Sequence, residues 1–133
     1  MSKLIILSGS SNSGKSEALI NLANKIGILS SQQCPFSKDF KAICKKGNKT
    51  VAICTAGDSD AITSENMDYF DNNISDVYIS AARTKGATVT TLENWAKSNN
   101  IDCLFLTKSW AKNANNAYSQ FNDKFADFLN SLI

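Results

Sequence analysis

The sequence contains no histidine, and its cysteines are few and scattered. Without histidine, no Ser-His or Cys-His catalytic arrangement can form. The four cysteines, Cys34, Cys44, Cys54 and Cys103, include no C-x-x-C pair, so the spacing typical of a zinc site is missing. Because Cys54 and Cys103 lie inside apolar runs, we expect both to be buried, reduced thiols.

Long hydrophobic runs and a strong charge of one sign are missing as well. No apolar run approaches the ~18 residues of a membrane span, and the N-terminus lacks the charged-then-apolar pattern of a signal peptide. The net charge of +2 is too small to indicate a nucleic-acid partner. The length suits a single domain covering residues 1–133, and we expect a cytoplasmic protein.

What the sequence does contain is a complete G-x-x-x-x-G-K-[ST] pattern near its start. The pattern consists of Gly9, Ser10, Ser11, Asn12, Ser13, Gly14, Lys15 and Ser16. The apolar run 3–7 before it predicts a buried strand, and residues 17–26 after it predict a helix. A strand, a glycine-rich loop and a helix in this order are the context that a phosphate-binding loop requires. The alternative is a Ser- and Gly-rich turn between two structural elements.

These residue types suit a bound triphosphate. Backbone N–H groups curled into a nest can point at phosphate oxygens, and the positive end of the following helix adds to the attraction. Gly9 and Gly14 allow backbone conformations that a Cβ would obstruct. Lys15 would reach the β- and γ-phosphates, and the Ser16 hydroxyl would be one ligand of a bridging Mg²⁺ ion.

On these residues the chain resembles the P-loop nucleoside-triphosphate-binding superfamily, and in particular its small kinase-like members. The match covers residues 3–26, and the rest of the chain is similar only in the order of its elements. The resemblance implies a P-loop fold and the binding of ATP with Mg²⁺.

The remaining pattern predicts an α/β fold. Apolar runs predict core strands at 3–7, 50–55, 76–81 and 102–106, and periodicity predicts helices at 14–29, 60–72, 90–99 and about 118–132. Thr90 and Glu93 form a capping box for the third helix. Residues 30–35 are expected to be a loop. Residues 40–44 pair with 50–55 in a hairpin, although a short helix is the alternative. We therefore expect a three-layer α/β/α sandwich with a mostly parallel sheet and an antiparallel hairpin strand at its edge.

A second acidic residue is the next requirement of the resemblance. P-loop proteins usually hold Mg²⁺ with an Asp directly after four apolar strand residues. Here Thr55 follows the apolar residues 51–54, and the first acid is Asp58. Asp58 is nevertheless the candidate metal ligand, because ligands gather beyond the carboxyl ends of parallel strands. The alternative is that Asp58 or Ser59 caps the next helix.

Arg83 is the only arginine among the fourteen basic residues. Its expected place is just past the strand 76–81, on the ligand side of the sheet. A guanidinium there could neutralise charge on a transferring phosphoryl group, so Arg83 joins Lys15 and Asp58 as a candidate catalytic residue. The alternative is a surface salt bridge.

Three functions remain open. The first is Mg²⁺-dependent phosphoryl transfer from ATP to a small acceptor, with the hairpin and the loop 30–38 helping to form the acceptor pocket. Such kinases typically use several arginines, and this chain has one. The second is slow ATP hydrolysis; Lys108 lacks the flanking residues of an N-K-x-D motif, so ATP is favoured over GTP. The third is a non-catalytic nucleotide-binding module of a larger assembly.

Overall fold

The computed structural model describes residues 2–9, 14–35, 37–84, 86–108 and 117–133, and only the backbone of residues 117–119. Within these ranges the chain forms six strands and four helices. They are β1 (Lys3–Ser8), α1 (Lys15–Ile26), β2 (Ile28–Gln33), β3 (Phe40–Lys46), β4 (Lys49–Cys54), α2 (Asp60–Asn72), β5 (Val77–Ala82), α3 (Thr88–Ser98), β6 (Asp102–Thr107) and α4 (Ala117–Ser131).

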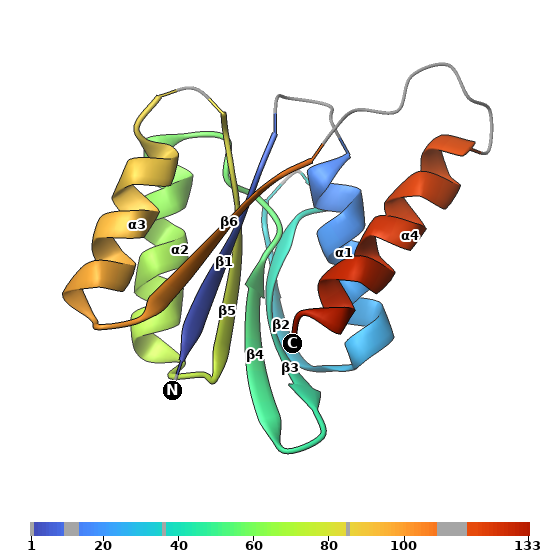
Figure 1. Cartoon of the computed structure of the whole chain (residues 1–133), viewed down its shortest axis with the longest axis horizontal. Helices are drawn as coiled ribbons and strands as arrows, with labels where there is room; N and C mark the ends of the chain where they lie inside the picture. Colours follow the sequence, from blue (N-terminus) through green and yellow to red (C-terminus); the bar gives the residue numbers. More distant parts are fainter. Residues whose placement is uncertain (1, 10–13, 36, 85, 109–116) are drawn as a thin grey trace.

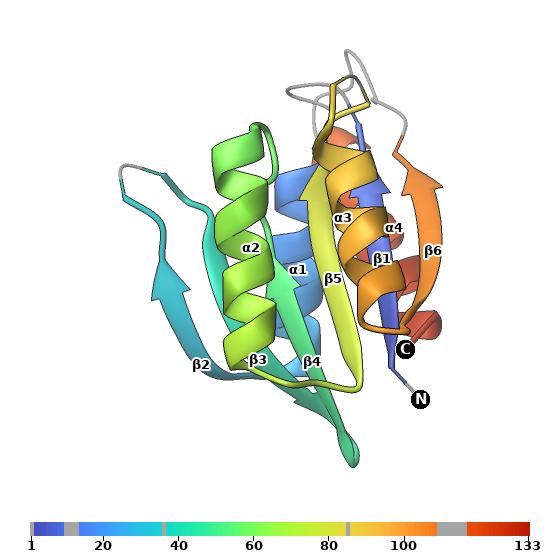
Figure 2. The same cartoon turned by 90° about the vertical axis from the view of Figure 1, so that its left-hand side faces the viewer.

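The strands form one mostly parallel sheet in the order β2-β3-β4-β5-β1-β6. The pairs β4–β5, β5–β1 and β1–β6 are parallel, whereas β3 pairs antiparallel with both β2 and β4. Figure 2 shows β2 and β6 at opposite edges of this sheet. In the register, Ser8 stands opposite both Ala82 and Thr107, so β1, β5 and β6 end at the same level.

Helices cover both faces of the sheet, with α1 and α4 on one side and α2 and α3 on the other (Figure 1). The alternation of side chains in β1 serves both layers: Ile5 and Leu7 belong to the core beneath α1 and α4, and Leu4 and Ile6 to the core beneath α2 and α3. All four side chains are fully buried, and each contributes roughly 1.5–3 kcal/mol relative to an exposed position. The backbone that leads into the glycine-rich loop is therefore anchored on both faces.

An aromatic cluster fixes α2 on its face of the sheet. Phe70 of α2 is fully buried, and its ring centroid lies 5.0 Å from that of Tyr78 in β5 and 5.5 Å from that of Trp95 in α3. Tilted aromatic pairs at this separation are favourable beyond their buried area. This contact holds the helix whose other side chains line a cavity described below.

The hairpin prediction is confirmed, but its place at the sheet edge is wrong. Strands β3 and β4 pair antiparallel around Gly47, which has φ 60°. The expected loop at 30–35 is instead largely β2, which covers the outer side of β3 and becomes the edge strand. Helix α1 ends at Ile26, before the expected residue 29, because Gly27 adopts φ 112° and donates its N–H to the Ala23 carbonyl.

Two further expectations were wrong. Helix α3 begins at Thr88 with no side-chain cap at Ala87, so Thr90 and Glu93 lie inside the helix and form no capping box. Strand β6 is an exposed edge strand rather than a core strand, and Cys103 is exposed within it. Cys54 is buried as expected, and its burial raises the pKa of its thiol far above the usual value.

Among the described residues, no helix combines the length and the apolar character needed to cross a bilayer.

Candidate functional site

The glycine-rich loop (residues 9–16) begins where β1 ends. The Gly9 N–H donates to the Ala82 carbonyl at 3.2 Å, which ties the start of the loop to the end of β5. Gly14 precedes α1 in the left-handed conformation, with φ 85°, which favours glycine. The predicted phosphate-contacting residues Ser10, Ser11, Asn12 and Ser13 lie outside the described residues. The described ends of the loop thus lead from a buried strand to the N-terminus of a helix, a position at which anions bind readily.

Lys15 and Asp58, predicted from separate segments, meet at this helix start. The Lys15 Nζ lies 2.8 Å from Asp58 Oδ1, and the two side chains are 5% and 51% exposed. Because Asp58 is half in water, solvent screens part of the attraction between the two charges. An ammonium and a carboxylate are thus held together at the start of α1.

Asp58 pairs with Lys15, while Ser59 caps the next helix. The Ser59 side chain accepts a hydrogen bond from the Ile62 N–H at 3.2 Å, so it satisfies a free donor in the first turn of α2. Of the two candidate caps, the helix therefore uses Ser59, and the Asp58 carboxylate is turned to the glycine-rich loop.

Gly57 explains how an acid three positions beyond the usual place reaches Lys15. A Cβ at Gly57 would stand 1.9 Å from the Ala81 carbonyl oxygen, a backbone atom that cannot move aside freely. The loop after β4 therefore presses directly on the end of β5, which lies beside β1 in the sheet. This close approach brings Asp58 toward the glycine-rich loop. A rule that expects the acid directly after the apolar strand residues does not take such a contact into account.

Thr55, which the sequence did not single out, connects several parts of the site. Its carbonyl accepts a hydrogen bond from the Ser16 hydroxyl at 3.1 Å. Its own hydroxyl donates to Asp39 Oδ1 at 2.8 Å and accepts from the Phe40 N–H at 3.0 Å. The only signal in the sequence was a polar residue ending the apolar run 51–54, and Thr55 is fully buried. It links α1 to the segment before β3.

Ser16 and Asp58 carry oxygen atoms of the type that divalent cations bind. The Ser16 hydroxyl donates its proton in a hydrogen bond to the Thr55 carbonyl. Its oxygen keeps two lone pairs that can bind another partner. Hydroxyl and carboxylate oxygens are ligands that Mg²⁺ accepts, alongside waters and substrate phosphates. Within the described ranges, no group of three or more His, Cys, Asp or Glu side chains is placed to hold a metal ion. The oxygens of Ser16 and Asp58 are thus of the chemical type that Mg²⁺ accepts.

Arg83 stands one residue beyond the β5 carbonyl that contacts Gly9. Its N–H donates to the Thr88 hydroxyl at 3.1 Å, which holds its backbone in place, while its side chain is exposed. Within the described part of the chain its guanidinium forms no ion pair. The structure therefore brings the Arg83 backbone to the site without joining its side chain to Lys15 or Asp58.

Lys108, at the end of β6, points to α4. Its N–H donates to the Ser8 carbonyl at 2.8 Å, and its Nζ lies 4.7 Å from the centre of the Phe121 ring and 5.7 Å from that of Phe125. The residue is 2% exposed, and burial lowers the pKa of its ammonium group from the usual value. Lys108 thus helps hold α4 near the carboxyl end of β6.

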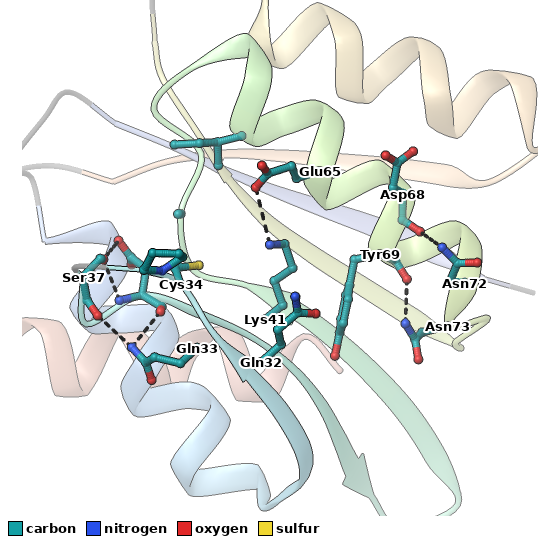
Figure 3. A pocket seen from close by; sticks show the side chains of 14 residues that line it. Gln32, Gln33, Cys34, Ser37, Lys41, Glu65, Asp68, Tyr69, Asn72 and Asn73 are labelled. Atoms are coloured by element: carbon teal, nitrogen blue, oxygen red, sulfur yellow. Dashed lines mark hydrogen bonds and ion pairs between the residues drawn. The ribbon is translucent and has the colours of Figure 1, made fainter.

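A cavity of about 730 Å³ opens beside this site, between α2 and the adjoining ends of β2 and β3 (Figure 3). We call it the α2 cavity. It includes Ala56 from the loop after β4 and Asp39 from the segment before β3. It therefore begins one residue from Thr55. Gln32–Pro35 and Ser37 also line it, and they belong to the region 30–38 that was expected to help form an acceptor pocket.

The walls of the α2 cavity are held by their own hydrogen bonds (Figure 3). Gln33 Nε2 donates to the Ser37 carbonyl at 2.7 Å and to the Asp39 carbonyl at 3.0 Å, which ties the end of β2 to the residues before β3. Across the cavity, Lys41 Nζ lies 3.7 Å from Glu65 Oε2 of α2. The cavity is thus bounded by the residues that Gln33 binds on one side and by α2 on the other.

Neither a scan against protein-family models nor a search of curated proteins found a match for this chain. Its function is therefore inferred from the contacts of Lys15, Ser16 and Asp58 and from the cavity beside them.

Gly57→Ala should destabilise the protein by about 1–3 kcal/mol, because the added methyl group forces the loop after β4 away from the Ala81 carbonyl. Urea unfolding followed by circular dichroism measures this change. Gly47→Asn is the control: no atom lies within 4 Å of its Cβ position, and Asn tolerates the φ of 60°. Equal stabilities of Gly57→Ala and wild type would contradict the close approach.

Proposed function

We propose that this protein binds Mg²⁺–ATP at the glycine-rich loop, in the manner of P-loop proteins, and transfers the terminal phosphoryl group to a small acceptor. The observation that carries the proposal is the arrangement around the start of α1. Gly14, whose backbone is in the left-handed conformation, is followed by Lys15 and Ser16. Asp58 Oδ1 lies 2.8 Å from Lys15 Nζ. The α2 cavity beside this arrangement favours transfer over plain hydrolysis, because an acceptor needs a place to bind.

The residues would share the work as follows. The N–H groups at the start of α1 and the Lys15 ammonium would bind the phosphates. To do so, Lys15 would exchange its present anionic partner, Asp58, for a phosphate oxygen. Asp58 and the Ser16 hydroxyl would then hold Mg²⁺, which when bound neutralises charge on the phosphate oxygens. Thr55 keeps Ser16 oriented through its carbonyl. Arg83 would swing its exposed side chain to the transferring group.

Lys15→Ala should weaken ATP binding by about 10- to 150-fold, because a hydrogen bond to a charged group contributes roughly 1.5–3 kcal/mol. Isothermal calorimetry with Mg²⁺–ATP measures the affinity, and circular dichroism verifies the fold. Lys25→Ala is a matched control on the same helix, since Lys25 pairs only with Asp123 and Asp127 of α4 among the described residues. Unchanged affinity in folded Lys15→Ala would refute the site.

Asp58→Asn should change ATP affinity in opposite directions with and without Mg²⁺. With Mg²⁺ the affinity should fall, because a metal ligand is lost. With a chelator it should rise or stay level, because the carboxylate that competes for Lys15 is gone. Calorimetry in both buffers tests this, with Asp60→Asn, an exposed acid two positions on, as the control. A loss of equal size in both buffers would remove the metal role of Asp58.

Arg83→Ala should lower the turnover rate by at least about 100-fold while ATP affinity changes less than about threefold, because its charge is needed only as the phosphoryl group transfers. Turnover is measured as phosphate release without acceptor and as transfer to a panel of nucleosides, sugars and amino alcohols. Arg83→Lys should recover only part of the rate. A wild-type protein that binds ATP without turning over in any mixture would instead be a nucleotide-binding module.

A further inference from the structure

The α2 cavity has the size and position of a second binding site. Its volume of about 730 Å³ falls within the range of small-molecule sites, roughly 300–1,000 Å³. It is joined to the glycine-rich loop by two hydrogen bonds: Ser16 donates to the Thr55 carbonyl, and the Thr55 hydroxyl donates to Asp39, which lines the cavity.

The charges that line the cavity are predominantly negative. Asp39, Glu65 and Asp68 provide three carboxylates, and Lys41 provides one ammonium group, which leaves a formal charge of −2. That ammonium group is already 3.7 Å from Glu65. The single arginine, Arg83, is not among the lining residues. An acceptor that carries a phosphate or carboxylate would therefore meet net repulsion, whereas a cation would be attracted.

The uncharged lining groups suit a polar, hydrogen-bonding ligand. The amide side chains of Gln32, Asn72 and Asn73 border the cavity, and Figure 3 shows the Tyr69 ring along the wall formed by α2. Amides and carboxylates accept hydrogen bonds from hydroxyl and amine groups, and the face of an aromatic ring packs against a sugar, base or cation. Burial raises the pKa of the Tyr69 phenol, so this ring stays uncharged.

Building on the proposed function, we infer that the α2 cavity binds the phosphoryl acceptor and that this acceptor is an uncharged or cationic molecule bearing hydroxyl or amine groups, not one already phosphorylated. The donor and the acceptor then bind at places of opposite charge. Triphosphate is drawn to Lys15 and the start of α1, and it is repelled from the cavity by the carboxylates of Asp39, Glu65 and Asp68.

The test uses pairs of probes that differ by one phosphate: adenosine and AMP, glycerol and glycerol 3-phosphate, ethanolamine and phosphoethanolamine. Each is titrated into the ¹⁵N-labelled protein, and binding is followed at the amide signals of Gln33, Tyr69 and Asn73, which line the cavity. At least one unphosphorylated member should shift these signals saturably. Its phosphorylated partner should bind about tenfold more weakly or worse. Equal or tighter binding of the phosphorylated members, or no shift from any probe, would overturn the inference.

A charge-neutralised variant tests the cause of the selectivity. In the double variant Glu65→Gln, Asp68→Asn, the affinity for an unphosphorylated probe should exceed that for its phosphorylated partner by about threefold or less. The fold should persist, because both side chains are exposed. Asp71→Asn is the matched control on α2: its side chain accepts from Trp95 Nε1, does not line the cavity, and the amide oxygen can keep that bond. An unchanged ratio in the double variant would show that these carboxylates do not select the ligand.

The two proposals fail in different ways. In Lys15→Ala, probe shifts at the cavity should remain while ATP binding is lost. A wild-type protein that binds ATP but shows no selective binding in the cavity would remove the acceptor inference alone. A wild-type protein that binds the unphosphorylated probes but not ATP would remove the proposed function, and with it the role of the bound molecule as an acceptor.

Discussion

The position of the glycine-rich loop depends on the parallel pairing of β1 with β5 on one side and β6 on the other. The register sets Ser8 opposite Ala82 and Thr107, so the loops that follow these strands begin at one level. A shift by one residue would turn the alternating side chains of β1 toward the wrong core, and those side chains are fully buried on both faces. The glycine-rich loop therefore starts from backbone that has little freedom to move, which suits a site that must hold a ligand in one orientation.

A second constraint acts where the loop after β4 meets the end of β5. Gly57 allows contact with the Ala81 backbone at a distance that a side chain would forbid, and this contact sets the direction of Asp58. Thr55, two residues earlier, fastens the same loop to α1 through Ser16 and to the segment before β3 through Asp39. The charged pair and the α2 cavity thus share one short, tightly packed segment, so displacement at one is expected to reach the other.

The sequence predicted the elements whose signals are local. The apolar run of β1, the bounds of α2 and the hairpin of β3 and β4 all followed from pattern. A motif and a position rule proposed Lys15, Ser16 and Asp58 as site residues, and the structure brings Lys15 and Asp58 into contact. The sequence analysis missed β2 because all its residues are exposed, so its sequence shows no alternation of buried and exposed positions. It is a strand because it pairs with β3. The apolar composition of β6 indicated a core strand, but composition does not say which strand lies at an edge. Asp39 and Thr55 could not be paired in advance, because they meet only when β3 lies beside β4.

The electrostatic arrangement gives the site a direction. Lys15 and the positive end of the α1 dipole concentrate positive potential at the glycine-rich loop. The carboxylates of Asp39, Glu65 and Asp68 make the cavity beyond Thr55 negative. The Asp58 carboxylate pairs with Lys15 at 2.8 Å, and a polyanion that replaced it as the partner of Lys15 would release this carboxylate. One exchange of partners at Lys15 would thus accommodate the anion and provide a metal ligand together, without any rearrangement of the strands that carry the residues.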